Sequence, residues 1–249
     1  MNKQIILLLA ALALLTAATA PARAGQLASV SLVNQNTGEH LQIWRHGGRN
    51  YVAGNPGERY AIEITNKTGA RVLSVVSVDG VNVINGATAS VAQSGYVLES
   101  WRPLEIKGWR KSMDEVAAFY FTSLPDSYAA RTGRADNVGV IGVALFQEYV
   151  EPAPVQEQYE SRAMAPAASG MAAQKSKSAD NAIGTGHGER LASASRATDF
   201  HRASEKPAEV ISIYYDTQAH LVARGIIPRL RSRMPDPSPF PGNFVPDPS

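Results

Sequence analysis

Short segments in which apolar and polar residues alternate, separated by turn residues, run from residue 26 to residue 150. In residues 59–66, for example, Tyr60, Ile62 and Ile64 fall on one face. An alternation with period two is typical of a strand that buries one face. Since no long helical pattern lies between these segments, we predict an all-β fold, an antiparallel β-sandwich of immunoglobulin-like or similar type.

A hairpin is the clearest local feature of this region. Asp79 and Gly80 separate two apolar segments, and both residues tolerate the positive φ values of a two-residue turn. The segments that should pair across it are residues 72–78 and 81–84. Further strands are predicted at residues 41–45, 96–98, 104–109, 115–122 and 138–148.

A polar connection at residues 124–137 separates the two most apolar strands, residues 117–121 and 138–146, which we expect at the centre of their sheets. Asp126 or Ser127 is placed to cap a short helical turn in this connection, and Gly133 to end it.

The pattern changes after residue 150. Residues 151–195 hold few large apolar side chains and include a glycine-rich stretch at 184–188, so we expect a disordered, low-complexity linker there. Residues 209–216 predict a strand and residues 217–224 a short helix. An isolated strand and helix do not fold alone. We therefore expect residues 196–227 to pack back onto the domain of residues 25–150, with a Pro-rich tail at 228–249.

The first 24 residues have the pattern of a signal peptide. Lys3 precedes an apolar run over residues 5–20, and Ala22 and Ala24 stand where small residues precede a cleavage site. A membrane anchor is the alternative, but the run is shorter than the roughly 20 residues that span a bilayer. We expect a periplasmic or secreted mature chain that begins at Gly25, with no transmembrane span after cleavage of the signal peptide.

The composition of the chain indicates its compartment and excludes one class of partner. The chain has no cysteine, and an exported protein without disulfides fits a bacterial periplasm better than eukaryotic secretion. It carries 24 Lys and Arg residues against 22 Asp and Glu residues, and the leader removes two of the basic ones, Lys3 and Arg23. A mature chain without net charge argues against nucleic acid as a partner.

Recognisable catalytic and metal-binding motifs are missing from the sequence. No two histidines have the spacing of a helical zinc site, and no Gly-x-Ser-x-Gly motif is present. We therefore predict no catalytic residue, no metal site and no cofactor. A dispersed Ser-His-Asp set remains open, because such triads are recognised by geometry.

Each of the three tryptophans precedes an arginine. Because neighbours on a strand point to opposite faces, we expect the rings of Trp44 and Trp101 to point into the core. Trp109 stands near a strand end, where it, Arg110 and Lys111 are candidates to contact a glycan or an anionic polymer.

The connection at residues 124–137 supplies two further candidate ligand-binding residues, Tyr128 and Arg131, because function concentrates on loops held by a rigid scaffold. The alternative that we favour is structural: Asp126 and Asp136 would pair with Arg131 and Arg134 and so brace the connection.

Several segments resemble a group of uncharacterised exported, β-rich proteins of Gram-negative bacteria. They are VVSVDG at 75–80, SGY at 94–96, GWRKS at 108–112, DSYAARTG at 126–133, NVGV at 137–140 and IYYD at 213–216. The resemblance covers residues 40–148 and 196–227 and implies export and β-structure. No activity, ligand or catalytic residue is known for that group, so it implies no function.

These observations favour a non-enzymatic envelope protein that binds or scaffolds an unknown partner, either an envelope protein or a cell-wall glycan. The alternative is an envelope hydrolase or glycan-acting enzyme with an unrecognised site near residues 124–137. A pocket with convergent titratable groups would favour the enzyme.

Overall fold

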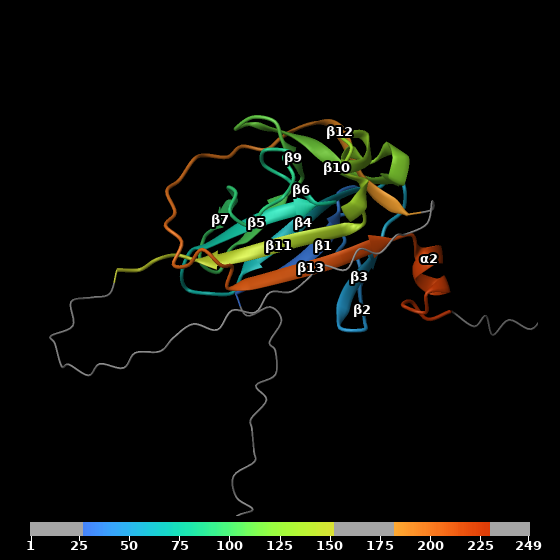
Figure 1. Cartoon of the computed structure of the whole chain (residues 1–249), viewed down its shortest axis with the longest axis horizontal. Coiled ribbons are helices and arrows are strands. Elements are labelled where there is room, and N and C mark those ends of the chain that lie inside the picture. The colour runs from blue at the N-terminus through green and yellow to red at the C-terminus, as the bar shows by residue number, and fades with distance from the viewer. Residues whose placement is uncertain (1–26, 152–181, 230–249) are drawn as a thin grey trace, which may run out of the picture.

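Two β-sheets pack against each other in the part of the chain that the computed structural model describes, residues 27–151 and 182–229 (Figure 1). The strands are β1 (Ala28–Asn34), β2 (Ile43–His46), β3 (Arg49–Ala53), β4 (Arg59–Asn66), β5 (Val72–Val78), β6 (Val81–Asn82), β7 (Tyr96–Leu98), β8 (Pro103–Ile106), β9 (Gly108–Arg110), β10 (Glu115–Ser123), β11 (Val140–Gln147), β12 (Ile183–Ala192) and β13 (Glu209–Asp216). The helical turns are η1 (Leu124–Asp126), α1 (Tyr128–Arg131), η2 (Ala135–Asn137) and α2 (Gln218–Ala223).

The first sheet has the strand order β1-β4-β10-β12, with β8 beside β4 and β9 beside β10. The second has the order β2-β3-β13-β11-β5-β6, with β7 beside β5. All pairs are antiparallel except β3 with β13, which run parallel. The predicted β-sandwich is therefore confirmed, including the C-terminal strand and short helix that pack back onto it.

The core lies between the two sheets and depends on the alternation in the sequence. Tyr60, Ile62 and Ile64 of β4 are fully buried, as the period-two pattern predicts. Aromatic rings fill the middle: Tyr60 stacks on Phe121 with ring centroids 4.4 Å apart and on Phe119 at 5.4 Å. Burial of each large apolar side chain contributes roughly 1.5–3 kcal/mol, so these inward faces dominate the stability of the fold.

Strands β10 and β11 occupy interior positions in their sheets, as their apolar sequences predict. The hairpin between β5 and β6 is also confirmed, because Asp79 and Gly80 have φ values of 53° and 72°. The predicted helix is α2, where the Thr217 side chain accepts a hydrogen bond from the amide of His220 at 3.2 Å.

Strand β12 corrects the predicted linker. We expected residues 151–195 to be disordered, but residues 183–192 form an edge strand that pairs with β10. Because its glycines have no side chain, neighbouring residues pack closely against its backbone. A Cβ on Gly184 would lie 2.5 Å from the Cβ of Ser127, and a Cβ on Gly186 would lie 2.2 Å from the ring of Tyr120. A segment poor in apolar residues thus joins the fold because neighbouring side chains fill the space above it.

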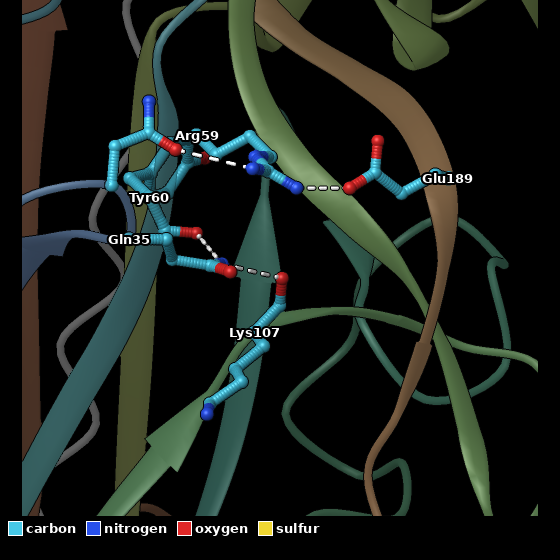
Figure 2. Close-up of polar contacts among 6 residues, drawn as sticks. Gln35, Arg59, Tyr60, Lys107 and Glu189 are labelled. Carbon is cyan, nitrogen blue, oxygen red and sulfur yellow. Dashed lines mark hydrogen bonds and ion pairs between the residues drawn. The ribbon is translucent and has the colours of Figure 1, made fainter.

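Polar contacts fix β12 across the neighbouring strand. Arg59 of β4 forms an ion pair with Glu189 of β12, so the pair spans β10 (Figure 2). Beside it, the side-chain amide of Gln35 donates to the carbonyl oxygens of Tyr60 at 2.6 Å and Lys107 at 3.1 Å (Figure 2). Lys107 is the single residue between β8 and β9. Gln35 therefore supports the first sheet where these two strands are interrupted.

Several predicted segments lie outside the described residues: the signal peptide at 1–24, residues 152–181 of the linker, and all but the first two residues of the tail at 228–249. No helix in residues 27–151 or 182–229 is long and apolar enough to cross a membrane.

Candidate functional site

The connection between β10 and β11 is built from short turns, as the sequence predicts. Ser127 caps α1: its hydroxyl accepts from the amide of Ala130 at 3.2 Å and donates to the carbonyl oxygen of Leu124 at 2.8 Å. Gly133 follows the helix with a φ of 74°. This geometry holds the side chains of α1 over the end of β12.

The predicted bracing by charge pairs is wrong. Among the described residues, no ion pair joins Asp126 or Asp136 to Arg131 or Arg134. Asp126 accepts from the hydroxyl of Ser123 at 2.6 Å. The guanidinium of Arg134 donates to neutral acceptors, the Gly86 carbonyl oxygen at 2.9 Å and the Thr132 hydroxyl. The connection is therefore held by hydrogen bonds between a charged group and a neutral partner, and neither Arg131 nor Arg134 forms an ion pair in the described residues.

A depression of about 480 Å³ opens where α1 meets β12. Its lining residues are Asp126, Tyr128, Arg131, Thr132 and His187. We call this feature the Tyr128 depression. The half-buried Tyr128 ring contacts Trp109 on the core side, with centroids 4.8 Å apart, and the His187 imidazole at 5.5 Å.

Two cations lie over the ring of Tyr128. The ammonium of Lys111 is 5.8 Å from the ring centroid and the guanidinium carbon of Arg134 is 5.9 Å from it. Cations at such distances are attracted by the π-electrons of the ring. Lys111 follows β9, Tyr128 and Arg131 belong to α1, and His187 belongs to β12, so three separate segments build the site.

Burial, more than neighbouring charge, lowers the pKa values of two basic groups of the site. Burial, and then the charge of Arg190, lowers the pKa of Lys111. Burial, followed by the charge of Lys111 and smaller effects of Arg190 and Arg131, lowers the pKa of His187 below 6.5. The His187 imidazole is therefore neutral at pH 7, while positive charges surround it.

The five predicted site residues divide into two groups. Tyr128 and Arg131 line the Tyr128 depression, and Lys111 lies over the ring of Tyr128. Trp109 is only 2% exposed and its indole nitrogen donates to the carbonyl oxygen of Gly186 at 3.1 Å, so its ring belongs to the core. Arg110 donates to the carbonyl oxygen and the hydroxyl of Ser193, and thereby ties the chain after β12 to β9.

Sequence reasoning missed His187, because we assigned its glycine-rich segment to the linker. The sequence does contain a strand pattern here, because Ile183, Thr185 and His187 alternate with glycines. This is a period-two pattern in which one face of the strand carries no side chains. In the register of β12 and β10, His187 stands opposite Phe119 and shares its face.

The other two tryptophans behave differently from each other. Trp44 is half-buried, but it packs with Tyr51 and Leu221 in a cluster separate from the core between the sheets, so the expectation that its ring enters that core is wrong. The prediction for Trp101 is wrong: its side chain is 67% exposed and its φ is 60°. It stands in a turn between β7 and β8, where strand alternation does not apply.

A second polar cluster, also missed, is buried between the sheets. Both oxygens of the fully buried Asp79 carboxyl accept hydrogen bonds: Oδ1 from the amide of Gly139 at 2.9 Å and from the Tyr215 hydroxyl, and Oδ2 from the amide of Thr185 at 2.7 Å. The Thr185 hydroxyl lies 2.7 Å from that of Tyr215 and 2.6 Å from that of Tyr60. These four side chains form one chain of hydroxyls that ends on a carboxyl.

Burial dominates the electrostatics of this cluster. It raises the pKa of Asp79 to about 6, although the hydrogen bonds from Tyr215, Thr185 and Gly139 favour the ionised form. Burial, and then the charge of Asp79, raises the pKa values of Tyr60 and Tyr215 well above their ordinary range. The enclosed cluster has no access to a ligand, and we assign it to the stability of the fold.

Within the described part of the chain, no group of three or more His, Cys, Asp or Glu side chains is placed to hold a metal ion. Comparison with family models, with curated proteins and with solved structures finds no match to this chain.

Proposed function

We propose that the mature chain is an exported envelope protein that acts as a binding module, and that the Tyr128 depression is its ligand face. The observation that carries the proposal is that Tyr128, Arg131 and His187 line one open depression and Lys111, from a third segment, lies 5.8 Å from the Tyr128 ring. An aromatic ring offers contact area at low entropic cost, and cations without acidic partners offer strong hydrogen-bond donors.

The charge state of the site supports this role. Among the described residues, neither Lys111 nor Arg131 takes part in an ion pair. The charges of both Lys111 and Arg131 act on the His187 imidazole and lower its pKa, and the fold alone gains nothing from placing two cations around it. A site that awaits a ligand accounts for their proximity.

Affinity capture from envelope fractions tests the proposed role. The tagged mature protein should retain one dominant partner, and the Lys111→Ala/Arg131→Ala double variant should lose most of it. The matched control is Arg45→Ala/Lys67→Ala, which removes two exposed cations: Arg45 lies on β2 of the other sheet, and Lys67 follows β4 at the end opposite to its pairing with β10. Equal retention by all three proteins would contradict the proposal.

Export is part of the proposal and rests on the pattern of residues 1–24. After expression in a Gram-negative host, cell fractionation should place the protein in the periplasm or the medium, and N-terminal sequencing should begin at Gly25. A full-length chain that stays in the cytoplasm would contradict it.

A hydrolase is the second candidate, because Asp126 and His187 line the same depression and His187 stays neutral at pH 7, as a general base requires. Turnover of envelope glycans or esters that His187→Ala abolishes, while the variant keeps its thermal stability, would favour this reading over a binding module.

A further inference from the structure

The Tyr128 depression presents an excess of positive charge. Arg131 lines it, and Lys111 and Arg134 lie 5.8 Å and 5.9 Å from the ring of Tyr128, against the single carboxylate of Asp126 in the lining. Arg134 donates to neutral oxygens, so its charge is not compensated. Arg190 contributes less, because it pairs with Glu115 at 2.8 Å.

The lining also includes hydrogen-bond acceptors. Asp126 offers carboxylate oxygens, one of which already accepts from the Ser123 hydroxyl, whereas the Thr132 hydroxyl is already bonded to Arg134 and to carbonyl oxygens of α1. A simple anion is attracted by the cations but repelled by Asp126. A ligand that carries both an anionic group and several hydroxyl donors satisfies the two halves of the lining together. Acidic sugars have this chemistry, and a depression of about 480 Å³ is large enough for a sugar unit and its anionic substituent.

We infer that the Tyr128 depression binds an acidic saccharide, with its carboxylate or phosphate group held by Lys111 and Arg131 and its hydroxyls donating to Asp126. Tyr128 is a positioning residue, since its ring attracts Lys111 and Arg134 and rests on Trp109. The inference rests on the proposed function and names the ligand class of the same site.

Binding should also be visible at His187. Tyr128 and Arg131 of α1, Asp126 of η1, Lys111 after β9, and Arg190 on its own strand are the titratable and charged groups around this imidazole. Because Lys111, Arg190 and Arg131 disfavour its protonation, an anion placed among them should raise the pKa of His187.

The experiment is calorimetric titration of the mature protein with four probes: trigalacturonate, neutral galactotriose, glucose 1-phosphate and inorganic phosphate. We expect trigalacturonate or glucose 1-phosphate to bind at least tenfold more tightly than galactotriose, and NMR to show a higher pKa of His187 in the complex. The arm that binds more tightly distinguishes a carboxylate from a phosphate.

Three variants locate the contacts. Lys111→Ala and Arg131→Ala should each weaken binding of the acidic probe about tenfold. Asp126→Ala should weaken it too, but should strengthen binding of inorganic phosphate, because it removes the one repelling carboxylate. Arg45→Ala is the control for charge alone, and thermal melting confirms that each variant is folded.

Affinity for galactotriose that equals the affinity for both trigalacturonate and glucose 1-phosphate would overturn the inference, and so would an Asp126→Ala variant that behaves in the same way toward the acidic saccharide and inorganic phosphate. If no saccharide binds while envelope capture still depends on Lys111 and Arg131, the ligand class is wrong and the binding module stands. If capture is also independent of these residues, the proposed function fails as well.

Discussion

Asp79 stabilises the fold through both its backbone and its side chain. Its backbone takes the positive φ that begins the β5–β6 turn, and its carboxyl accepts hydrogen bonds from Gly139, Thr185 and Tyr215. These partners precede β11 or lie on β12 and β13. One buried carboxyl therefore joins both sheets.

The pKa of Asp79 predicts how stability changes with pH. The native carboxyl has a pKa of about 6, against 3.8 for an ordinary aspartate. Between these values the native state keeps a proton that the unfolded chain releases, so the free energy of unfolding falls by about 3 kcal/mol in all as the pH rises from below 4 to above 6, and then levels off.

The variant Asp79→Asn isolates this effect, since asparagine has the same shape, tolerates positive φ and does not titrate in this range. Its amide must face one of the donors, which adds a cost that does not depend on pH. Denaturant unfolding of both proteins from pH 4 to pH 7 measures the difference. A difference that stays constant would mean that Asp79 titrates below pH 4.

The sequence predicts some residues of the site and not others for physical reasons. Tyr128 and Arg131 are found because they lie on a polar connection between apolar strands. Trp109 is misassigned because a glycine before it suggests a strand end, whereas Gly108 lies against β10: a Cβ there would be 2.1 Å from the Ala117 carbonyl oxygen. Local sequence does not reveal such a long-range approach.

At the scale of elements, β12 shows what hydrophobic patterning leaves out. The strands with large alternating side chains, such as β4 and β13, are predicted at their observed bounds. In the first half of strand β12, glycines occupy every second position. The side chains of Ser127, Val138 and Tyr120 fill the space next to these glycines. The parallel pairing of β3 with β13 likewise cannot be predicted from local sequence patterns, because it joins segments far apart in the chain.

Enlarging a glycine of β12 should therefore destabilise the fold. A Cβ on Gly184 would lie 2.5 Å from Ser127 and 2.6 Å from Val138, so Gly184→Ala should cost about 1–3 kcal/mol through overpacking. Gly69→Ala is the control, because its Cβ would have no neighbour closer than 3.7 Å. Equal thermal midpoints for the two variants would contradict this prediction and would show that the contacts around Gly184 have room for a methyl group.

At the scale of the whole molecule, the chain after residue 181 completes both sheets. Strand β12 covers the edge of β10, and β13 lies between β3 and β11. Without them β2 and β3 lose their connection to the second sheet, because β3 pairs with no strand of that sheet other than β2 and β13 in the described residues.

Residues 25–151 alone should consequently fail to unfold cooperatively, although they include most of the strands. Co-expression with residues 182–249 should restore a single thermal transition, because the two pieces share one core. A sharp transition in the short fragment by itself would show that the first 151 residues form an independent domain.

The central claim is that the Tyr128 depression is where this protein meets its partner. In-cell photo-crosslinking tests it most directly, with the reactive residue placed at the exposed Thr132 in the depression or at Arg45 on β2, an edge strand of the other sheet. We predict one discrete adduct from position 132 that Lys111→Ala/Arg131→Ala removes, and none from position 45. Adducts from position 45 alone, or adducts from position 132 that survive the double variant, would contradict the claim.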